Sequence, residues 1–233
     1  GAILAARLPQ ERDAIDQAVA FLDSVKQAAF TVADISRKPA SRSPRPPFIT
    51  STLQQEASQR LGFSVRQTMV IAQRLYESGK ITYMRTDSVN LSNLALQQAA
   101  EVIGARFGEQ YAQSRQYKTR SSGAQEAHEA IRPTDMKLQH PNLERDQARL
   151  YELIWKRTIA SQMSDAKLER TQVKIGANTH DELFSANGEM IKFDGFLKVY
   201  LEGIDDDEEE QDGMLPPLKE GDSLANKYIT ATE

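Results

Sequence analysis

Apolar residues recur with two different periods in the first part of the chain. Between Pro9 and Ala29 they return every three or four positions, which predicts a helix with one apolar face. Phe30–Ile35 alternates with a period of two and predicts a strand. Residues 36–47 then read SRKPASRSPRPP, with four prolines and four cationic side chains. Because proline cannot continue a helix or join the interior of a sheet, this segment predicts a linker between two domains.

Two capping motifs follow the predicted linker. Residues 51–54 (STLQ) and 64–67 (SVRQ) both fit the capping box, in which a hydroxyl and a glutamine side chain bond to the free N–H groups of a new helix. Gly62 and Gly79 suit left-handed helix ends. We therefore expect two helices joined by a short turn, similar to a helix-turn-helix.

Shorter signals continue the helical pattern as far as residue 162. Residues 81–85 (ITYMR) predict a short extended segment, so that the two helices and this strand resemble a winged-helix module. The spacing of apolar residues predicts further helices over 93–107 and 144–162.

Beyond Lys167 the apolar period changes to two. Thr171–Ile175 predicts a strand, and Asn187-Gly188 between two apolar runs predicts the tight turn of a β-hairpin. A further strand is expected over 223–230. The last third of the chain is therefore predicted to be mostly β.

These patterns together predict an α+β fold with two domains. A helical, winged-helix-like domain, residues 46–167, is expected to be inserted into a mostly β hinge domain made of residues 1–45 and 168–233. With 233 residues the chain is long enough for two small domains with their own cores.

The net charge of −4 hides an uneven distribution of charged residues. Residues 201–212 hold eight acidic and no basic side chains, and without them 29 basic residues face 25 of the chain's 33 acidic ones. Residues 35–85 contain nine Lys and Arg against two acidic residues. This basic stretch indicates a surface for a polyanion, although a solvated face balanced by the acidic loop explains it equally well.

The composition excludes several classes of protein. No apolar run approaches the length of a membrane span, so no membrane partner is expected. The absence of cysteine excludes disulfides, thiol catalysis and cysteine-bound zinc, and it fits a reducing cytoplasm. The three histidines are scattered, which argues against a histidine-rich metal site. Because the chain begins at Gly1 rather than methionine, we expect a piece of a longer protein.

Residues 81–88 (ITYMRTDS) concentrate reactive and polar side chains. On a strand, Tyr83 and Arg85 project to the same face, because side chains alternate. A guanidinium beside a phenol favours the phenolate and can hold an attacked phosphate with two hydrogen bonds. A half-buried strand tyrosine beside a surface arginine explains the same pattern, so the residues alone leave both interpretations open.

A resemblance to a known family favours the first interpretation. The segment ITYMRTDS, the preceding STLQQEASQRLGFSVRQTMVIAQRLYESGK and the following QEAHEAIRPTD (125–135) strongly resemble the bacterial type IA DNA topoisomerase I family. The resemblance covers essentially the whole chain. Met84 favours the topoisomerase I branch, since topoisomerase III and reverse gyrase commonly have proline there.

The resemblance assigns roles to nine residues. It implies that Tyr83 attacks a phosphodiester of single-stranded DNA and becomes linked to the 5′-phosphate, that Arg85 binds that phosphate, and that His128 is an active-site histidine. The positions with supporting or DNA-binding roles are Thr82, Thr86, Asp87, Gln73, Glu77 and Arg132.

Simpler interpretations remain for three of these assignments. His128 taken alone is more typical of a structural histidine, and only its surrounding motif points to the active site. Arg132 could bond to loop carbonyls next to Pro133. Gln73 and Glu77 could form an exposed pair on one helix face, since they are four residues apart.

The resemblance also implies Mg²⁺, bound by an acidic cluster in an N-terminal domain that this chain lacks. Asp205, Asp207 and Glu209 match the D-x-D-x-E string of that cluster literally. We reject them as ligands because the motif should end a hydrophobic strand, and Gly203-Ile204 supplies none. No Walker motif is present, which fits an ATP-independent isomerase.

The sequence therefore predicts the strand-gate fragment of a bacterial topoisomerase I. The whole enzyme would relax negatively supercoiled DNA as a cytoplasmic, nucleoid-associated monomer, and the fragment alone is expected to be inactive. The alternative is a non-catalytic winged-helix DNA-binding protein, which would use its basic second helix in a groove. The two differ at Tyr83, because only the enzyme requires a covalent phosphotyrosine.

Overall fold

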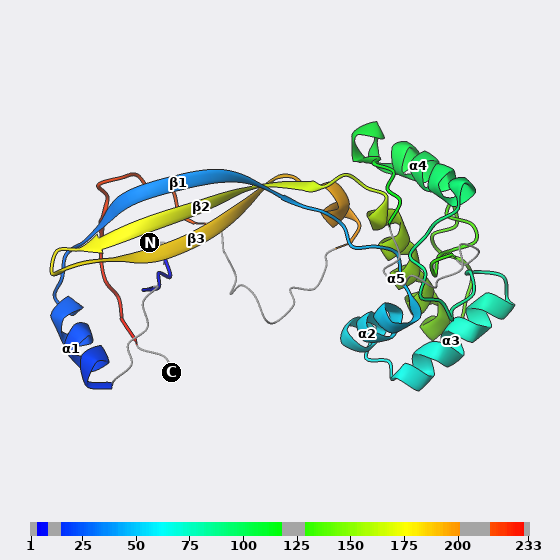
Figure 1. Ribbon diagram of the computed structural model, residues 1–233, viewed down its shortest axis with the longest axis horizontal. Helices are drawn as coiled ribbons and strands as arrows, with labels where there is room; N and C mark the ends of the chain where they lie inside the picture. Colours follow the sequence, from blue (N-terminus) through cyan, green and yellow to red (C-terminus); the bar gives the residue numbers. More distant parts are fainter. Residues whose placement is uncertain (1–3, 9–14, 118–128, 201–214, 231–233) are drawn as a thin grey trace. The chain divides into compact units, whose positions relative to one another are not determined.

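The computed structural model describes residues 4–8, 15–117, 129–200 and 215–230 (Figure 1). The chain forms two compact units. The first contains Gly1–Ser41, Lys167–Phe193 and Ile204–Glu233, and the second contains Arg42–Ala166 and Asp194–Gly203. The prediction assigned residues 168–233 to the β domain, whereas Asp194–Gly203 belongs to the helical unit.

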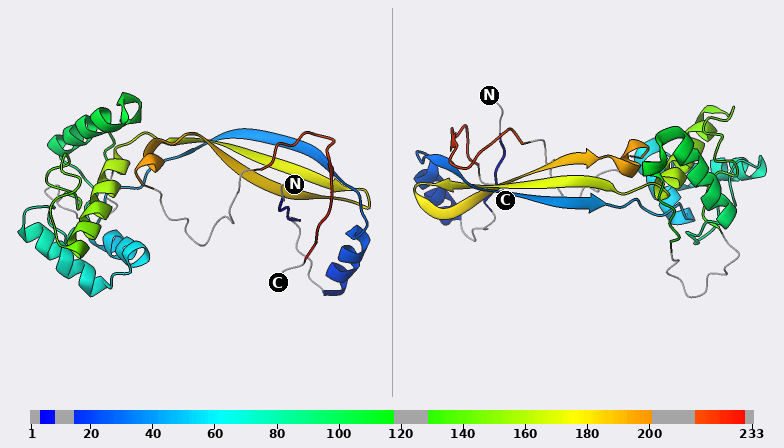
Figure 2. Two further views of the ribbon diagram at one scale, coloured as in Figure 1. Left: turned by 180° about the vertical axis from the view of Figure 1, so that it is seen from behind. Right: turned by 90° about the horizontal axis from the view of Figure 1, so that it is seen from above.

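The first unit is built on a four-stranded sheet in the order β3-β2-β1-β4 (Figures 1 and 2). The strands are β1 (Phe30–Arg42), β2 (Ala166–Ala177), β3 (His180–Phe193) and β4 (Ser223–Leu224), and the one described helix of this unit is α1 (Ile15–Val25). Together with the helices of the second unit, this sheet confirms the predicted α+β class.

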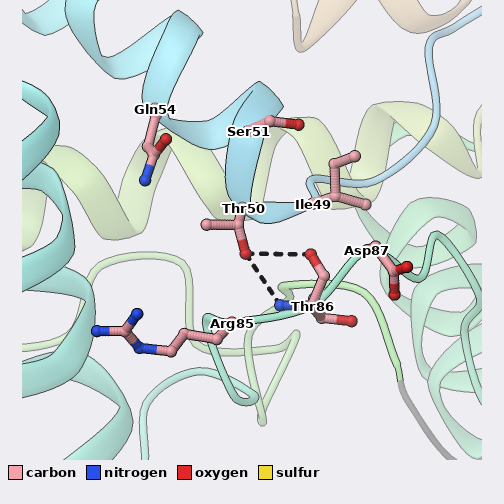
Figure 3. Close-up of a pocket in the computed structure, with 7 residues that line it drawn as sticks. All are labelled: Ile49, Thr50, Ser51, Gln54, Arg85, Thr86 and Asp87. Carbon is pink, nitrogen blue, oxygen red and sulfur yellow. Dashed lines mark hydrogen bonds between the residues drawn. The ribbon is translucent and has the colours of Figure 1, made fainter.

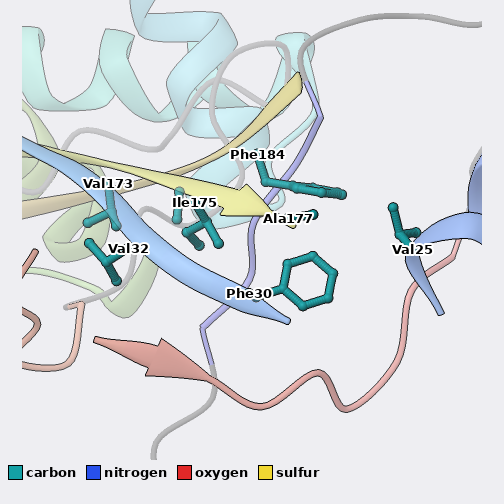
Figure 4. Close-up of a cluster of buried hydrophobic side chains, with 8 residues drawn as sticks. Val25, Phe30, Val32, Val173, Ile175, Ala177 and Phe184 are labelled. Atoms are coloured by element: carbon teal, nitrogen blue, oxygen red, sulfur yellow. The ribbon is translucent and has the colours of Figure 1, made fainter. Parts of the chain in front are cut away.

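The core of the first unit lies on one face of this sheet. Alternate residues of β1, β2 and β3 point to that face because of the pleat, and they meet the end of α1 there (Figure 4). The buried residues are Val25, Phe30, Val32, Val173, Ile175, Ala177, Phe184 and Ala186.

The predicted hairpin turn at Asn187-Gly188 is wrong. β3 runs through this dipeptide, with Asn187 opposite Gln172, and the turn lies instead at residues 178–179, between Ala177 and His180. Asn178 is held there by Ala29, whose N–H donates to the Asn178 side-chain oxygen at 2.9 Å and whose carbonyl accepts from the Asn178 N–H at 3.1 Å. The long strand also keeps two core side chains of β3 opposite those of β2, which a turn at 187 would prevent.

The predicted linker is also partly wrong, because β1 continues through Pro39 as far as Arg42. On its side away from β2, β1 pairs with β4 only at Phe30 and Thr31. Proline lacks an N–H, so β1 has one backbone donor fewer at residue 39.

The second unit contains the four predicted helices, which are thereby confirmed. They are α2 (Thr50–Leu61), α3 (Val65–Glu77), α4 (Asn93–Phe107) and α5 (Arg145–Ser161), with two short 3₁₀ turns, Glu109–Tyr111 and Gly195–Lys198. Helix α5 is the most buried of them, and Trp155 at its centre is fully buried, with its indole N–H donating to the Met136 carbonyl at 2.8 Å.

Helices α2 and α3 are joined by a tight turn, as predicted. Gly62 ends α2 in the left-handed region at φ 70°, and Ser64 caps α3 by accepting from the Gln67 N–H at 3.1 Å. The capping box predicted at residues 51–54 is wrong. The N-cap is Ile49 rather than Ser51, so α2 begins two residues earlier than that motif predicts, and the Thr52 hydroxyl accepts from the Ile49 N–H at 3.1 Å.

The winged-helix detail is not confirmed. Residues 81–85 are not a strand, and only an isolated bridge joins Ile81 to Pro133. The predicted strand over 223–230 shrinks to Ser223–Leu224. Among the described helices, none combines the length and apolar character needed to cross a bilayer.

A buried charged cluster, here called the Glu56 cluster, ties α2 to α5 and to the segment after the second 3₁₀ turn. Glu56 accepts from Arg157 and from Arg60, each at 2.9 Å, and from the Tyr200 hydroxyl. The Arg60 and Arg157 guanidiniums both lie over the Tyr200 ring, at 4.6 and 5.5 Å from its centroid, respectively. Burial, followed by the bond to Glu56, raises the pKa of Tyr200 above its usual value.

Candidate active site

The segment after α3 is anchored by buried apolar side chains and exposes the residues between them. Ile81 and Met84 are each 1% exposed, whereas Tyr83 is 45% exposed and Arg85 is also exposed. The predicted alternation therefore holds for exposure only over Tyr83, Met84 and Arg85, because Ile81 is buried and the backbone is not that of a strand. The two reactive side chains are presented to solvent on a fixed backbone.

Thr82 joins this segment to the second motif of the sequence analysis. Its N–H donates to the Arg132 carbonyl at 2.9 Å, and its hydroxyl donates to the Ala130 carbonyl at 2.7 Å and accepts from the Arg132 N–H at 2.9 Å. Residues 82 and 130–132 are far apart in the sequence, and these bonds place them side by side. Thr82 therefore holds the segment that contains Tyr83 against residues 130–132.

The N-terminus of α2 holds the segment from the other side. The Thr50 hydroxyl accepts from the Thr86 N–H at 2.9 Å (Figure 3). It also lies 2.8 Å from the Met84 carbonyl, and the Thr50 N–H donates to the Thr86 carbonyl at 3.0 Å. Thr86 uses its own hydroxyl to accept from the Ser88 N–H at 3.1 Å. The backbone on both sides of Arg85 is therefore fixed to α2.

A shallow pocket of about 480 Å³ lies between α2 and this segment (Figure 3). Arg85 and Asp87 extend from its two sides and point away from each other. No hydrogen bond or ion pair joins the Arg85 guanidinium to any side chain in the part of the chain that the structure describes. The residues that line the pocket are Ile49, Thr50, Ser51, Gln54, Arg85, Thr86 and Asp87.

Tyr83 packs against another tyrosine that the sequence analysis did not consider. The ring of Tyr76, on α3, meets the Tyr83 ring edge to face, with centroids 5.2 Å apart. On the same helix Gln73 donates to Glu77 at 2.7 Å, so this pair bonds to itself on an exposed face. This is the geometry expected if Gln73 and Glu77 form an exposed pair on one helix face.

Arg132 is largely covered and has protein partners. Its side chain is 12% exposed, pairs with Glu129 at 2.6 Å and donates to the Pro133 carbonyl at 2.9 Å. Burial acts to raise the pKa of the Glu129 carboxyl, but hydrogen bonds from Arg132 and Ser92 outweigh it and hold this pKa below its usual value. Arg132 therefore braces its own loop, and its predicted DNA contact stays a prediction.

His128 lies outside the described residues, so its predicted role is not tested here. The acidic run 205–210 lies outside them as well. Among the residues that the structure does describe, no three acidic or histidine side chains lie together so that they could hold a metal ion. The described residues therefore do not fit a magnesium site.

Thr50 and Tyr76 are the neighbours of the candidate site that sequence reasoning missed. Thr50 stands directly before the capping motif and carries no pattern of its own. For Tyr76, helical spacing predicts only an exposed position on α3. Neither signal reveals a contact with residues 83–86, because both contacts depend on the tertiary fold.

Comparisons with known proteins agree on one family. The family model described as DNA topoisomerase matches residues 6–233 of the chain. DNA topoisomerase 1 of Rickettsia bellii is 48% identical over 222 residues, which are 89% of this chain and 28% of that protein. DNA topoisomerase 1 of Synechocystis is 48% identical over 214 residues, which are 88% of this chain and 24% of that protein.

A solved structure agrees with these relatives. Full-length topoisomerase I from Thermotoga maritima matches with a TM-score of 0.77 and 34% identity, over 95% of this chain and 37% of the other. The chain thus spans 37% or less of the relatives named here. The match over residues 6–233 and the identities of 48% show that the chain belongs to the DNA topoisomerase family and resembles its bacterial topoisomerase I members.

Proposed function

We propose that this chain is the strand-gate part of a topoisomerase that cleaves and rejoins one strand of DNA through Tyr83. The observation that supports it is that Tyr83 and Arg85 are both exposed, two positions apart, on a segment whose backbone is held by hydrogen bonds. In addition, Arg85 has no side-chain partner in the described residues. An arginine already bound to a carboxylate would have to give up that partner before it could bind a phosphate. Arg85 does not have this obstacle.

In the proposed reaction the Tyr83 oxygen attacks the phosphorus of a DNA phosphodiester. The bond from phosphorus to the 3′-oxygen breaks, the tyrosine hydroxyl loses its proton, and the 3′-oxygen gains one. The product is a 5′-phosphotyrosyl ester and a free 3′-hydroxyl, and the reverse attack rejoins the strand. Because the ester retains the energy of the broken bond, no ATP is needed for rejoining.

Arg85 is proposed to hold the phosphate during this attack. A guanidinium presents two parallel N–H donors that match two phosphate oxygens, and its charge offsets the negative charge that builds up on them. Nearby, Thr82 and Thr86 are proposed to keep the segment in place through the bonds described above. Asp87, Gln73, Glu77, His128 and Arg132 remain proposed as supporting or DNA-binding residues.

The proposed substrate of the whole protein is the single-stranded region of negatively supercoiled DNA. The helical unit would hold the 5′ end on Tyr83 while the β unit acts as a hinge, and the other strand would pass through the gap. The whole protein is proposed to act as a monomer on the bacterial nucleoid in the cytoplasm. Its Mg²⁺ is proposed to bind to residues outside this chain, so no step above depends on it.

The test is a tyrosine substitution in the full-length enzyme that carries this chain. Tyr83→Phe removes only the hydroxyl, so DNA binding should be retained and the covalent adduct lost after denaturation. Tyr76→Phe is the matched control, because it removes the neighbouring hydroxyl and keeps the ring contact. Adduct in the Tyr83→Phe enzyme would refute the assignment of Tyr83 as the nucleophile. Absence of adduct from the unsubstituted enzyme would instead favour the alternative, in which α2 and α3 form a non-catalytic DNA-binding module.

A further inference from the structure

One threonine bonds to the backbone on both sides of Arg85. The Thr50 hydroxyl lies 2.8 Å from the Met84 carbonyl and 3.1 Å from the Thr86 carbonyl, and it accepts from the Thr86 N–H at 2.9 Å. The Thr50 N–H adds a bond to the Thr86 carbonyl at 3.0 Å. A single residue of α2 therefore bonds to the Met84 carbonyl on one side of Arg85 and to the Thr86 backbone on the other, the side drawn in Figure 3.

Helix α2 is a firm support for these bonds. Leu53 and Ala57 are fully buried, and Glu56 connects the helix to Arg157 of α5 at 2.9 Å. The segment that contains Arg85, by contrast, has no helix or strand of its own. The position of its backbone is set by buried Ile81 and Met84 and by the bonds of Thr50 and Thr82, rather than by a helix or strand.

The direction of Arg85 depends on that backbone. A long side chain with no partner samples several rotamers, and all of them start from the same Cα–Cβ bond. A shift or rotation of residues 84–86 would move the whole set of rotamers relative to Tyr83. Holding the backbone is therefore the one restraint on Arg85 that the described residues provide before a phosphate binds.

We propose that Thr50 is a positioning residue for the cleavage reaction. Its hydroxyl fixes residues 84–86 so that the Arg85 guanidinium meets the phosphate attacked by Tyr83. Thr50 itself need not touch the DNA. This inference rests on the proposed function and adds a residue to which neither the sequence motifs nor that function assign a role.

Three variants of the full-length enzyme that carries this chain test the proposal. Thr50→Val keeps the shape of the side chain and removes both the donor and the acceptor. Thr50→Ser keeps the hydroxyl and removes a methyl group. Thr52→Val is the matched control, because the Thr52 hydroxyl lies in the same turn of α2 and, among the described residues, bonds only to Ile49.

Two quantities are measured for each variant: the affinity for a single-stranded oligonucleotide, and the rate of covalent adduct formation once that oligonucleotide is saturating. Misplacing a reacting group by about 1 Å can cost about 100-fold in rate. We therefore expect Thr50→Val to lower the adduct rate by about 10- to 100-fold and to change the affinity by less than about twofold. Thr50→Ser should recover most of the rate, and Thr52→Val should retain it.

A second comparison separates positioning from general stability. If Thr50 acts through Arg85, then Thr50→Val should lower the rate much less in an enzyme that already carries Arg85→Lys, since residues that share one function are not additive. Equal losses in both backgrounds would overturn the proposal. So would a Thr50→Val enzyme with a normal rate, or a Thr52→Val enzyme that loses as much as Thr50→Val.

The outcomes also distinguish this inference from the proposed function. A large loss of rate in Arg85→Lys with none in Thr50→Val refutes only the role of Thr50. A normal rate in Arg85→Lys refutes the phosphate-binding role of Arg85, and the inference about Thr50 is refuted with it. Thermal unfolding of each full-length variant, followed by circular dichroism, shows whether it is folded at the assay temperature.

Discussion

Neutralising Glu56 should destabilise the helical unit far more than neutralising a surface glutamate. The Glu56 and Arg157 side chains are 9% and 4% exposed, and their charged atoms lie 2.9 Å apart. Glu56→Gln keeps the shape of the side chain but leaves the Arg157 charge buried without a counter-charge. Arg60, which is 30% exposed, can turn toward solvent, so most of the cost falls on Arg157.

The expected cost is about 3–5 kcal/mol, the range measured when one partner of a buried ion pair is removed. With a urea dependence of about 2 kcal/mol per molar, this corresponds to a fall in the unfolding midpoint of about 1.5–2.5 M. The control is Glu152→Gln. Glu152 pairs with Lys156 at 2.8 Å, but both side chains are 40% exposed, and exposed pairs of this spacing contribute about 0.3–0.5 kcal/mol.

The measurement is urea unfolding followed by tryptophan fluorescence. Trp155 is the only tryptophan of the chain and is fully buried in α5, so its signal reports the helical unit alone. Because the signal comes from one unit, the unfolding curve can be fitted without assuming that both units unfold in a single two-state transition. If Glu56→Gln lowers the unfolding midpoint no more than Glu152→Gln, the Glu56 cluster does not stabilise the helical unit through a buried ion pair.

Three further predictions concern the site and the pH dependence. Arg85→Lys keeps the charge and loses the planar fork, so adduct formation by the full-length enzyme should fall far more than oligonucleotide affinity, and equal losses would indicate a general electrostatic role. Burial, and next the charge of Asp135, raise the pKa of Tyr151 to about 12, so the stability that this neutral group contributes should be complete below pH 10 and be lost as the pH rises toward 12. Tyr151→Phe should flatten that decline in Trp155 unfolding curves. The isolated chain should bind single-stranded DNA with a log–log salt slope of about 0.7 for each phosphate neutralised, and should form no adduct; a Tyr83-dependent adduct at a rate comparable with the full-length enzyme would refute the fragment interpretation.

The helical unit was largely predictable from the sequence because its signals are local. Gly62 and Ser64 mark the turn between α2 and α3 through their own backbone preferences. The sheet was harder, since its pairing depends on residues that are distant in the chain. Asn187-Gly188 has the strongest local turn preference in the sheet, yet the bonds between Asn178 and Ala29 and the register of β2 with β3 determine where the chain turns.

In the candidate site, too, local features could be predicted and contacts between distant residues could not. Tyr83 and Arg85 were found because they share one short motif, and their exposure on either side of buried Met84 follows from alternation. Thr50 was missed because nothing in its neighbourhood indicates a partner 34 or 36 residues away. Arg132 was found in a motif, but its pairing with Glu129 could not be inferred from spacing alone.

The length of β1 has a consequence for association between molecules. A strand edge with free N–H and C=O groups can recruit the edge of another chain and start an aggregate. Among the described residues, β4 covers β1 only at Phe30 and Thr31, and the later part of the strand carries the cations Arg37 and Lys38. Their charges repel a second copy of the same edge, and neutralising both would remove this repulsion. The basic composition that first suggested a linker therefore opposes self-association through β1.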